Sequence, residues 1–264
     1  MFQYTQFRNA RIRFSDKGKG RTIVLLHGFP LSLEMWKEFS DELSKKFRII
    51  CIDLPGHGES DCIGYVHSME LMAECVKVVM DFLHLRKYIL VGHSMGGYTT
   101  MAFAELFPDN LKGICLFHSS ALADTDAKKK DRDRSIQLVK KHPKQFTNQL
   151  AENLFFEKNK TRFKKEISFL KIIFSNTSQR SIIACLQGMK DRKNREMILK
   201  FSNYPILFII GKKDGIIPPE LILPQTELPE KKEILLLDNV GHAGFYEAKQ
   251  EILNALIVFA KKCF

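Results

Sequence analysis

Long apolar stretches are missing from this chain of 264 residues. The longest apolar runs are short ones such as residues 206–210, whereas a membrane-spanning helix needs about 18 or more apolar residues in succession. Residues 1–4 also lack the basic and then apolar pattern with which a secretory signal begins. We therefore expect a cytoplasmic protein without a membrane span.

Paired cysteine motifs are absent as well. The six cysteines form no C-x-x-C pair, and Cys51 and Cys115 lie inside apolar, strand-like runs where free thiols behave as small hydrophobic side chains. Residues 17–20 lack the spacing of a phosphate-binding loop, no H-E-x-x-H occurs, and the eight histidines are scattered. The sequence therefore predicts no disulfide, no metal and no cofactor.

Positive charge is present in excess, and it is concentrated in one segment. The formal net charge is +11, and residues 121–200 hold 20 Lys and Arg against 9 Asp and Glu, while the rest of the chain holds 21 of each. No helix-turn-helix, zinc-finger or RNA-binding pattern accompanies this charge, so we expect no nucleic acid partner. A solvated, lysine-rich helical surface is the simpler interpretation.

Short apolar runs alternate with helical stretches through most of the chain. The runs cover residues 22–26, 48–54, 88–92, 111–118, 205–211 and 232–237. Strands that are apolar throughout are typical of a parallel sheet with helices on both faces. Two further runs, at residues 2–7 and 11–15, flank a short turn and indicate an antiparallel start. The pattern predicts an α/β fold with a mostly parallel sheet.

The alternation stops after residue 117 and resumes near residue 204. Phe163, Ile167, Leu170 and Phe174 follow a helical spacing within this interval. In open α/β sheets the ligand-binding crevice lies at the carboxyl ends of the strands, so an excursion of this length can cover it. We predict a core of residues 1–120 and 201–264 and a helical lid, or cap, of residues 121–200.

A G-x-S-x-G motif, Gly92 to Gly96, follows one predicted strand and precedes a predicted helix. In that context the motif forms a sharp turn that exposes the serine hydroxyl at the start of the helix. Glycine is needed at both ends of the motif because a side chain there would clash where the chain turns. Ser94 is therefore the candidate nucleophile.

A serine nucleophile needs a base and an acid that orients the base, in the chain order serine, acid, histidine. Asp214 follows the strand predicted at residues 205–211, and His242 follows the strand predicted at residues 232–237. Asp214 could instead simply form a turn before Gly215, and His242 could simply begin a helix. Their joint occurrence in the required order favours Asp214 as acid and His242 as base.

Two backbone N–H groups must also stabilise the oxyanion of the reaction. Met95 follows the nucleophile directly, and Phe29 lies in the loop after the strand predicted at residues 22–26. Pro30 has no N–H to donate, but it stiffens this loop. We expect the N–H groups of Phe29 and Met95 to form the oxyanion hole.

Five segments together resemble the α/β-hydrolase fold superfamily: residues 27–30, 53–60, 92–97, 211–214 and 241–242. The resemblance runs from Thr22 to the C-terminus and leaves the predicted lid without a family pattern. It implies a Ser94, Asp214 and His242 triad, with Asp53 and His57 shaping a turn. The serine at the motif's centre is unlike haloalkane dehalogenases and epoxide hydrolases, which use aspartate there, and unlike dienelactone hydrolases, which use cysteine.

We predict a serine hydrolase, a carboxylesterase that cleaves a small-molecule ester through an acyl-enzyme. Three alternatives stay open. The first is a triad-based lyase or C–C hydrolase on an anionic metabolite, similar to the menaquinone-pathway synthase of this fold. The second is a perhydrolase similar to the cofactor-free haloperoxidases, suggested by residues 27–31. The third is a non-enzymatic receptor for a small ligand.

The predicted lid offers two further expectations. Phe155, Phe156 and Phe163 could line the substrate pocket, although packing of the lid on the core would also explain them. The basic residues could draw an anionic substrate or an acidic carrier protein. For that role we favour Lys158, Lys160, Arg162, Lys164 and Lys165 over Lys128, Lys129 and Lys130, which are close to Asp131 and Asp133.

Overall fold

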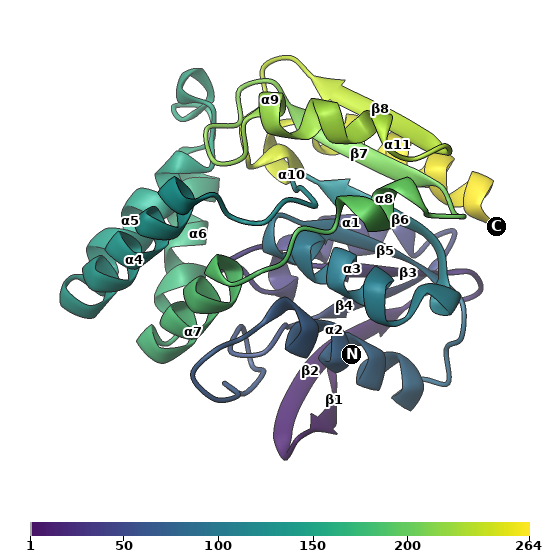
Figure 1. Ribbon diagram of the computed structural model, residues 1–264, viewed down its shortest axis with the longest axis horizontal. Coiled ribbons are helices and arrows are strands. Elements are labelled where there is room, and N and C mark those ends of the chain that lie inside the picture. Colours follow the sequence, from purple (N-terminus) through teal and green to yellow (C-terminus); the bar gives the residue numbers. More distant parts are fainter. Residues whose placement is uncertain (1) are drawn as a thin grey trace.

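A single eight-stranded sheet forms the centre of the protein in the computed structural model, which describes residues 2–264 (Figure 1). The strands are β1 (Phe2–Phe7), β2 (Ala10–Lys17), β3 (Thr22–Leu26), β4 (Arg48–Ile52), β5 (Tyr88–His93), β6 (Leu111–Phe117), β7 (Ile206–Gly211) and β8 (Lys232–Leu237). Their order across the sheet is β1-β2-β4-β3-β5-β6-β7-β8. β1 pairs antiparallel with β2 and β2 with β4, whereas all later pairs are parallel. The predicted α/β class and the antiparallel start are confirmed.

Helices cover both faces of the sheet. The core helices are α1 (Lys37–Leu43), α2 (Met69–Phe82), α3 (Met95–Leu106), α9 (Pro219–Ile222), α10 (Gly244–Glu247) and α11 (Lys249–Cys263). Val24 and Leu26 of β3 pack in the same apolar cluster as α2 and α3. Ile23 and Leu25 of that strand pack in the cluster that contains α1 and α11. Each central strand is therefore buried on both faces, as an apolar run without alternation predicts.

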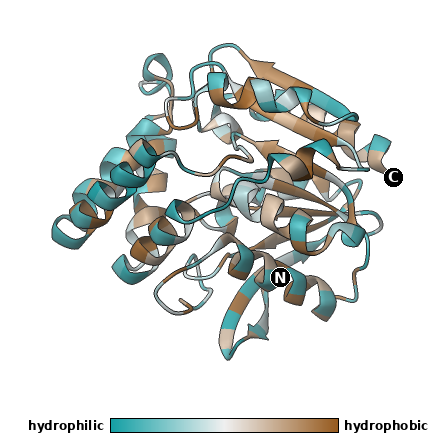
Figure 2. Ribbon diagram, in the orientation of Figure 1, coloured by the Kyte–Doolittle hydropathy of each residue, from teal (hydrophilic) through white to brown (hydrophobic). Residues whose placement is uncertain are grey.

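Five helices lie between β6 and β7. They are α4 (Asp126–Lys141), α5 (Pro143–Asn153), α6 (Lys164–Ser175), α7 (Gln179–Lys190) and α8 (Glu196–Lys200). We call residues 121–200 the helical insert. Its α4 to α7 lie together beside one end of the sheet, at the left of Figure 1. The residues of α4 are mostly hydrophilic, whereas the central strands of the sheet are mostly hydrophobic (Figure 2).

Short 3-10 turns complete the chain, at Leu33–Trp36, Pro108–Asn110, Glu157–Asn159 and Leu223–Glu227. No helix within residues 2–264 is both long and apolar enough to cross a membrane. The cysteines are all free thiols in this structure, and burial raises the pKa of Cys51 and of Cys263 to about 12.

Candidate active site

Ser94 lies at a sharp turn between β5 and α3. Its backbone has φ 51° and ψ −115°, a conformation that residues other than glycine rarely adopt. Two bonds fix the residue: its N–H donates to the carbonyl of Phe117 over 2.9 Å, and Ser119 Oγ donates to its carbonyl over 2.8 Å. A Cβ on Gly96 would meet the carbonyl oxygen of His27 at 2.7 Å. The turn therefore requires the glycine that the motif provides.

Asp214 and His242 come together at the carboxyl ends of β7 and β8. The Nδ1 of His242 donates to Asp214 Oδ2 over 2.7 Å. The N–H groups of Ile216 and Ile217 both donate to Asp214 Oδ1 over 2.9 Å. Burial alone would raise the pKa of Asp214, but His242, His118 and the N–H of Ile217 together lower it. Asp214 is therefore a fixed carboxylate that orients His242.

Two more buried histidines pack around this pair. His93 Nε2 donates to the carbonyl of His242 over 3.0 Å, and the two rings are 4.9 Å apart. His118 Nδ1 accepts the N–H of Gly211 over 3.2 Å. Burial lowers the pKa of His118 to about 3 and also lowers that of His93. Both rings support the site through packing and hydrogen bonds.

A cavity of about 220 Å³ is lined by Ser94 and His242 together. Its walls come from the core and from the helical insert. About half of the lining residues are apolar, and these are Phe29, Phe146, Leu150, Leu154, Leu186, Met189, Ile216 and Ile217. Charged side chains also line the cavity, namely Lys128, Asp131 and Arg132. Apolar walls combined with a few polar groups are typical of a small-molecule site.

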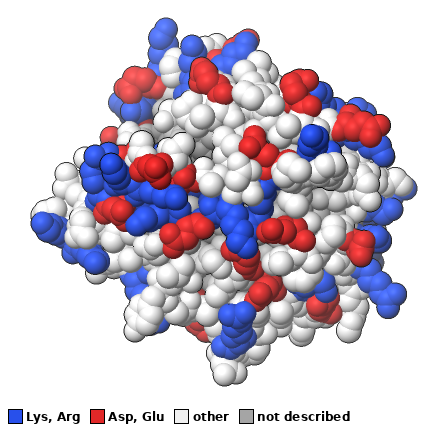
Figure 3. Space-filling view, viewed as in Figure 1, with Lys and Arg blue, Asp and Glu red and all other residues white. Residues whose placement is uncertain are grey.

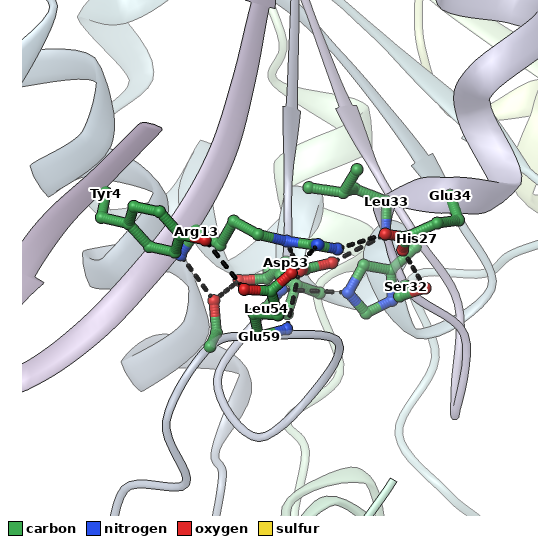
Figure 4. A network of polar contacts seen from close by, with 10 residues as sticks. Tyr4, Arg13, His27, Ser32, Leu33, Glu34, Asp53, Leu54 and Glu59 are labelled. Carbon is green, nitrogen blue, oxygen red and sulfur yellow. Dashed lines mark hydrogen bonds and ion pairs between the residues drawn. The ribbon is translucent and has the colours of Figure 1, made fainter. Parts of the chain in front are cut away.

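Phe29 lies in the loop after β3, which a buried polar network supports (Figure 4). Arg13 Nε donates to Asp53 Oδ2 over 2.5 Å, and Asp53 Oδ1 accepts the N–H of Leu33 over 2.8 Å. His27 Nε2 accepts the N–H of Leu54 over 3.0 Å, while its Nδ1 donates to the neighbouring carbonyl of Gly28 over 2.8 Å. The network therefore ties the loops that follow β3 and β4 to each other.

The loop that carries His242 is held by the helical insert. The carbonyl of Leu154 accepts the N–H of His242 over 2.7 Å and that of Ala243 over 2.8 Å. Glu247 accepts the N–H of Gly241 over 2.8 Å and that of Phe156 over 3.0 Å. Sequence reasoning missed both contacts, because a main-chain carbonyl just after α5 and a glutamate in α10 leave no motif.

The three phenylalanines expected in the substrate pocket lie elsewhere. Phe155, Phe156 and Phe163 are not among the residues that line the cavity beside Ser94. Phe155 instead packs on Phe163 and stacks on Tyr246, with ring centres 5.7 and 6.1 Å apart. We correct the expectation: Phe155 and Phe163 join the insert to the core, and Phe29 and Phe146 are the phenylalanines at the cavity.

The basic residues favoured for an anionic substrate also lie away from this cavity. Lys160 forms an ion pair with Glu157, and Lys165 lines a different hollow together with Phe163. Lys128, which the sequence made a second choice, lines the cavity with Ser94. Charge spacing along the chain was misleading here because it does not tell which face of a helix points toward the site.

The sequence matches the family model described as alpha/beta hydrolase fold over residues 21–249, a range that includes Ser94, Asp214 and His242. It is 30% identical over 251 residues to the AB hydrolase superfamily protein YisY of Bacillus subtilis, covering 92% of each chain. It is 26% identical over 258 residues to the pimeloyl-[acyl-carrier protein] methyl ester esterase of Pseudoalteromonas atlantica, covering 91% of this chain and 94% of that one.

Among solved structures, the thermophilic esterase of Thermogutta terrifontis superposes with a TM-score of 0.92. The two sequences are 28% identical, and the match covers 98% of this chain and 97% of the esterase. The likeness therefore extends over the core and the helical insert alike.

Proposed function

Since the chain belongs to the alpha/beta hydrolase fold family, we propose that it is a serine carboxylesterase for small esters. The observation that carries the proposal is the shared cavity of Ser94 and His242, with Asp214 bonded to the far nitrogen of His242. The esterases among the relatives support the same reaction class.

In this proposal each residue of the triad has one role. His242 Nδ1 carries the proton that it donates to Asp214, so a neutral His242 has Nε2 free to accept the proton of Ser94. The Ser94 oxygen then attacks the ester carbonyl, the alcohol leaves with the proton from His242, and an acyl-enzyme is formed. Water activated by His242 releases the acid.

The oxyanion is the charge that this reaction must stabilise. Met95 begins α3 directly after Ser94, so its N–H lies at the positive end of the helix dipole. Phe29 lies at the cavity from the opposite loop. We assign the two oxyanion-hole donors to the N–H groups of Phe29 and Met95.

The helical insert acts as a lid in this proposal. Its residues Phe146, Leu150 and Leu186 form part of the cavity wall, and residues 1–120 and 201–264 form the catalytic core. Because the cavity measures only about 220 Å³, the acyl group that it accepts is a short one.

A series of p-nitrophenyl esters of rising chain length tests the proposal. We expect turnover to be greatest for short acyl chains, and Ser94→Ala to reduce it by at least about a thousandfold. A preference for long chains would refute the assignment of the cavity. Release of a single equivalent of p-nitrophenol per protein, without turnover, would instead indicate a ligand receptor.

A further inference from the structure

The cavity beside Ser94 adjoins a second hollow of about 310 Å³. Tyr98, Lys128 and Ile217 line both. Asp124 and Arg192 lie in the wall of the second hollow only. A substrate held at Ser94 therefore lies beside a charged region, and Lys128 lines its own cavity.

Most charges of this region are already paired. Asp124 is buried between two arginines, accepting from Arg192 Nη1 over 2.5 Å and from Arg132 Nε over 2.9 Å. The Arg192 guanidinium also lies over the ring of Tyr98, 4.0 Å from its centre. Asp131 lines the cavity beside Ser94, as Arg132 does, and it pairs with Arg134 of the same helix. Two arginines on one carboxylate leave the inner cluster with a net positive charge.

Among the charged residues in the walls of these two hollows, Lys128 is the exception. Asp124 and Asp131 make their ion pairs with arginines, and Lys128 makes none. Its side chain is half-buried at the junction of the two hollows. Burial and the neighbouring Arg132 lower the pKa of Lys128, while Asp124 and Asp131 oppose this shift in part. A cation in these surroundings gains more from an anionic partner than a lysine in water does.

We propose that Lys128 binds a carboxylate of the substrate, so that the preferred substrates are short esters that carry a second, free carboxylate. This inference rests on the proposed esterase function, because it places the carboxylate in the space next to the nucleophile. The two arginines are already paired with Asp124, whereas the ammonium of Lys128 has no carboxylate partner within residues 2–264 and lines the cavity beside Ser94.

The charge gathered elsewhere on the helical insert does not serve this role. On the face seen in Figure 3, Lys and Arg lie over the region of α4 with acidic groups among them. Lys171 and Lys190, for example, form ion pairs with Glu152 and Asp133. These pairs lie on the surface, whereas Lys128 lines the cavity beside Ser94.

Two matched pairs of esters test the inference, with acid release followed by titration at constant pH. Monomethyl glutarate against methyl pentanoate places the carboxylate on the acyl side, and 3-acetoxypropanoate against propyl acetate places it on the alcohol side. We expect kcat/KM to favour the carboxylate in at least one pair. In Lys128→Gln that preference should fall by about tenfold or more, the effect of losing a hydrogen bond to a charged group.

Two variants control for charge and for folding. Lys130→Gln removes the same charge from the exposed side of α4 and should leave the preference as it is. Lys128→Arg keeps the charge in the cavity and should retain most of the preference. If the preference for the carboxylate fell equally in Lys128→Gln and Lys130→Gln, it would come from the overall positive charge of the insert rather than from a contact with Lys128. That result would overturn the inference.

The two proposals fail in different ways. If neutral esters are hydrolysed in a Ser94-dependent manner but neither carboxylate is preferred, the Lys128 site is wrong and the esterase stands. If no ester of either kind is hydrolysed, or if Ser94→Ala retains the activity, the esterase itself is wrong.

Discussion

Arg13→Ala removes the centre of the buried network in Figure 4. Arg13 is 3% exposed and Asp53 is fully buried, so the bond between them lies in a poorly hydrated place. The other two partners, Glu34 and Glu59, are half-exposed or nearly so, and each of their pairs contributes less than about 1 kcal/mol. Leaving Asp53 without Arg13 should cost about 3–5 kcal/mol.

The stability lost in Arg13→Ala should depend on pH, because Asp53 gains or loses a proton over the accessible range. Burial raises the pKa of Asp53 to about 6, although Arg13 and the N–H groups of Leu33 and Glu59 lower it. The unfolded chain releases the same proton near pH 4. Between about pH 4 and pH 6 the folded state still holds this proton, while the unfolded chain has released it. The contribution of Asp53 to the free energy of unfolding therefore falls as the pH rises through this range. Without Arg13 the pKa rises further, and the window extends above pH 6.

Thermal unfolding followed by circular dichroism at pH 5 and pH 8 measures the effect. For 264 residues the entropy of unfolding is about 0.55 kcal/mol/K, so 3–5 kcal/mol lowers Tm by about 5–9 °C at pH 8. The decrease in Tm should be smaller at pH 5, where Asp53 is protonated. Arg11→Ala, which removes an exposed arginine from the same strand, should change little. Equal falls for both variants at pH 8 would refute the reasoning.

Two further predictions concern the loop of His242. Asp214→Asn removes the acceptor that holds Nδ1 of His242 in its tautomer, so kcat should fall by about 10⁴-fold in steady-state assays while the fold is kept; retention of activity within tenfold would contradict the role of Asp214. Glu247→Ala leaves the N–H of Gly241 without its acceptor, which should cost about 1–3 kcal/mol of stability in chemical denaturation and lower kcat. Glu251→Ala, an exposed change on α11, is the control, and equal effects of the two would exclude a role for Glu247.

Local patterns in the sequence predicted the strands well. The expected runs at residues 22–26 and 232–237 coincide with β3 and β8, and the predicted start at residues 2–7 coincides with β1. β3 is recognised because its residues are all buried and apolar, as a strand covered on both faces requires. β1 and β8 lie at the edges of the sheet and are partly exposed. The turn at Ser94 was equally predictable, since its glycines are required by close backbone contacts.

Contacts between distant segments were not predictable from the same patterns. Leu154 holds the His242 loop through a main-chain carbonyl, an atom that every residue has. Phe155 and Phe163 have the composition of a pocket wall, but Tyr246 offers them a packing partner that lies far along the sequence. Lys128 has acidic neighbours in sequence, yet those neighbours bond to arginines instead. Which side of α4 points inward is decided by tertiary packing.

The central claim is that Ser94 becomes acylated during turnover. The most direct measurement is acid quenching of the protein during hydrolysis of p-nitrophenyl butyrate, followed by peptide mass mapping. We predict a butyryl group on Ser94 in the wild type and no such group in Ser94→Ala. Turnover that persists with the acyl group on another residue, or in Ser94→Ala, would contradict the account.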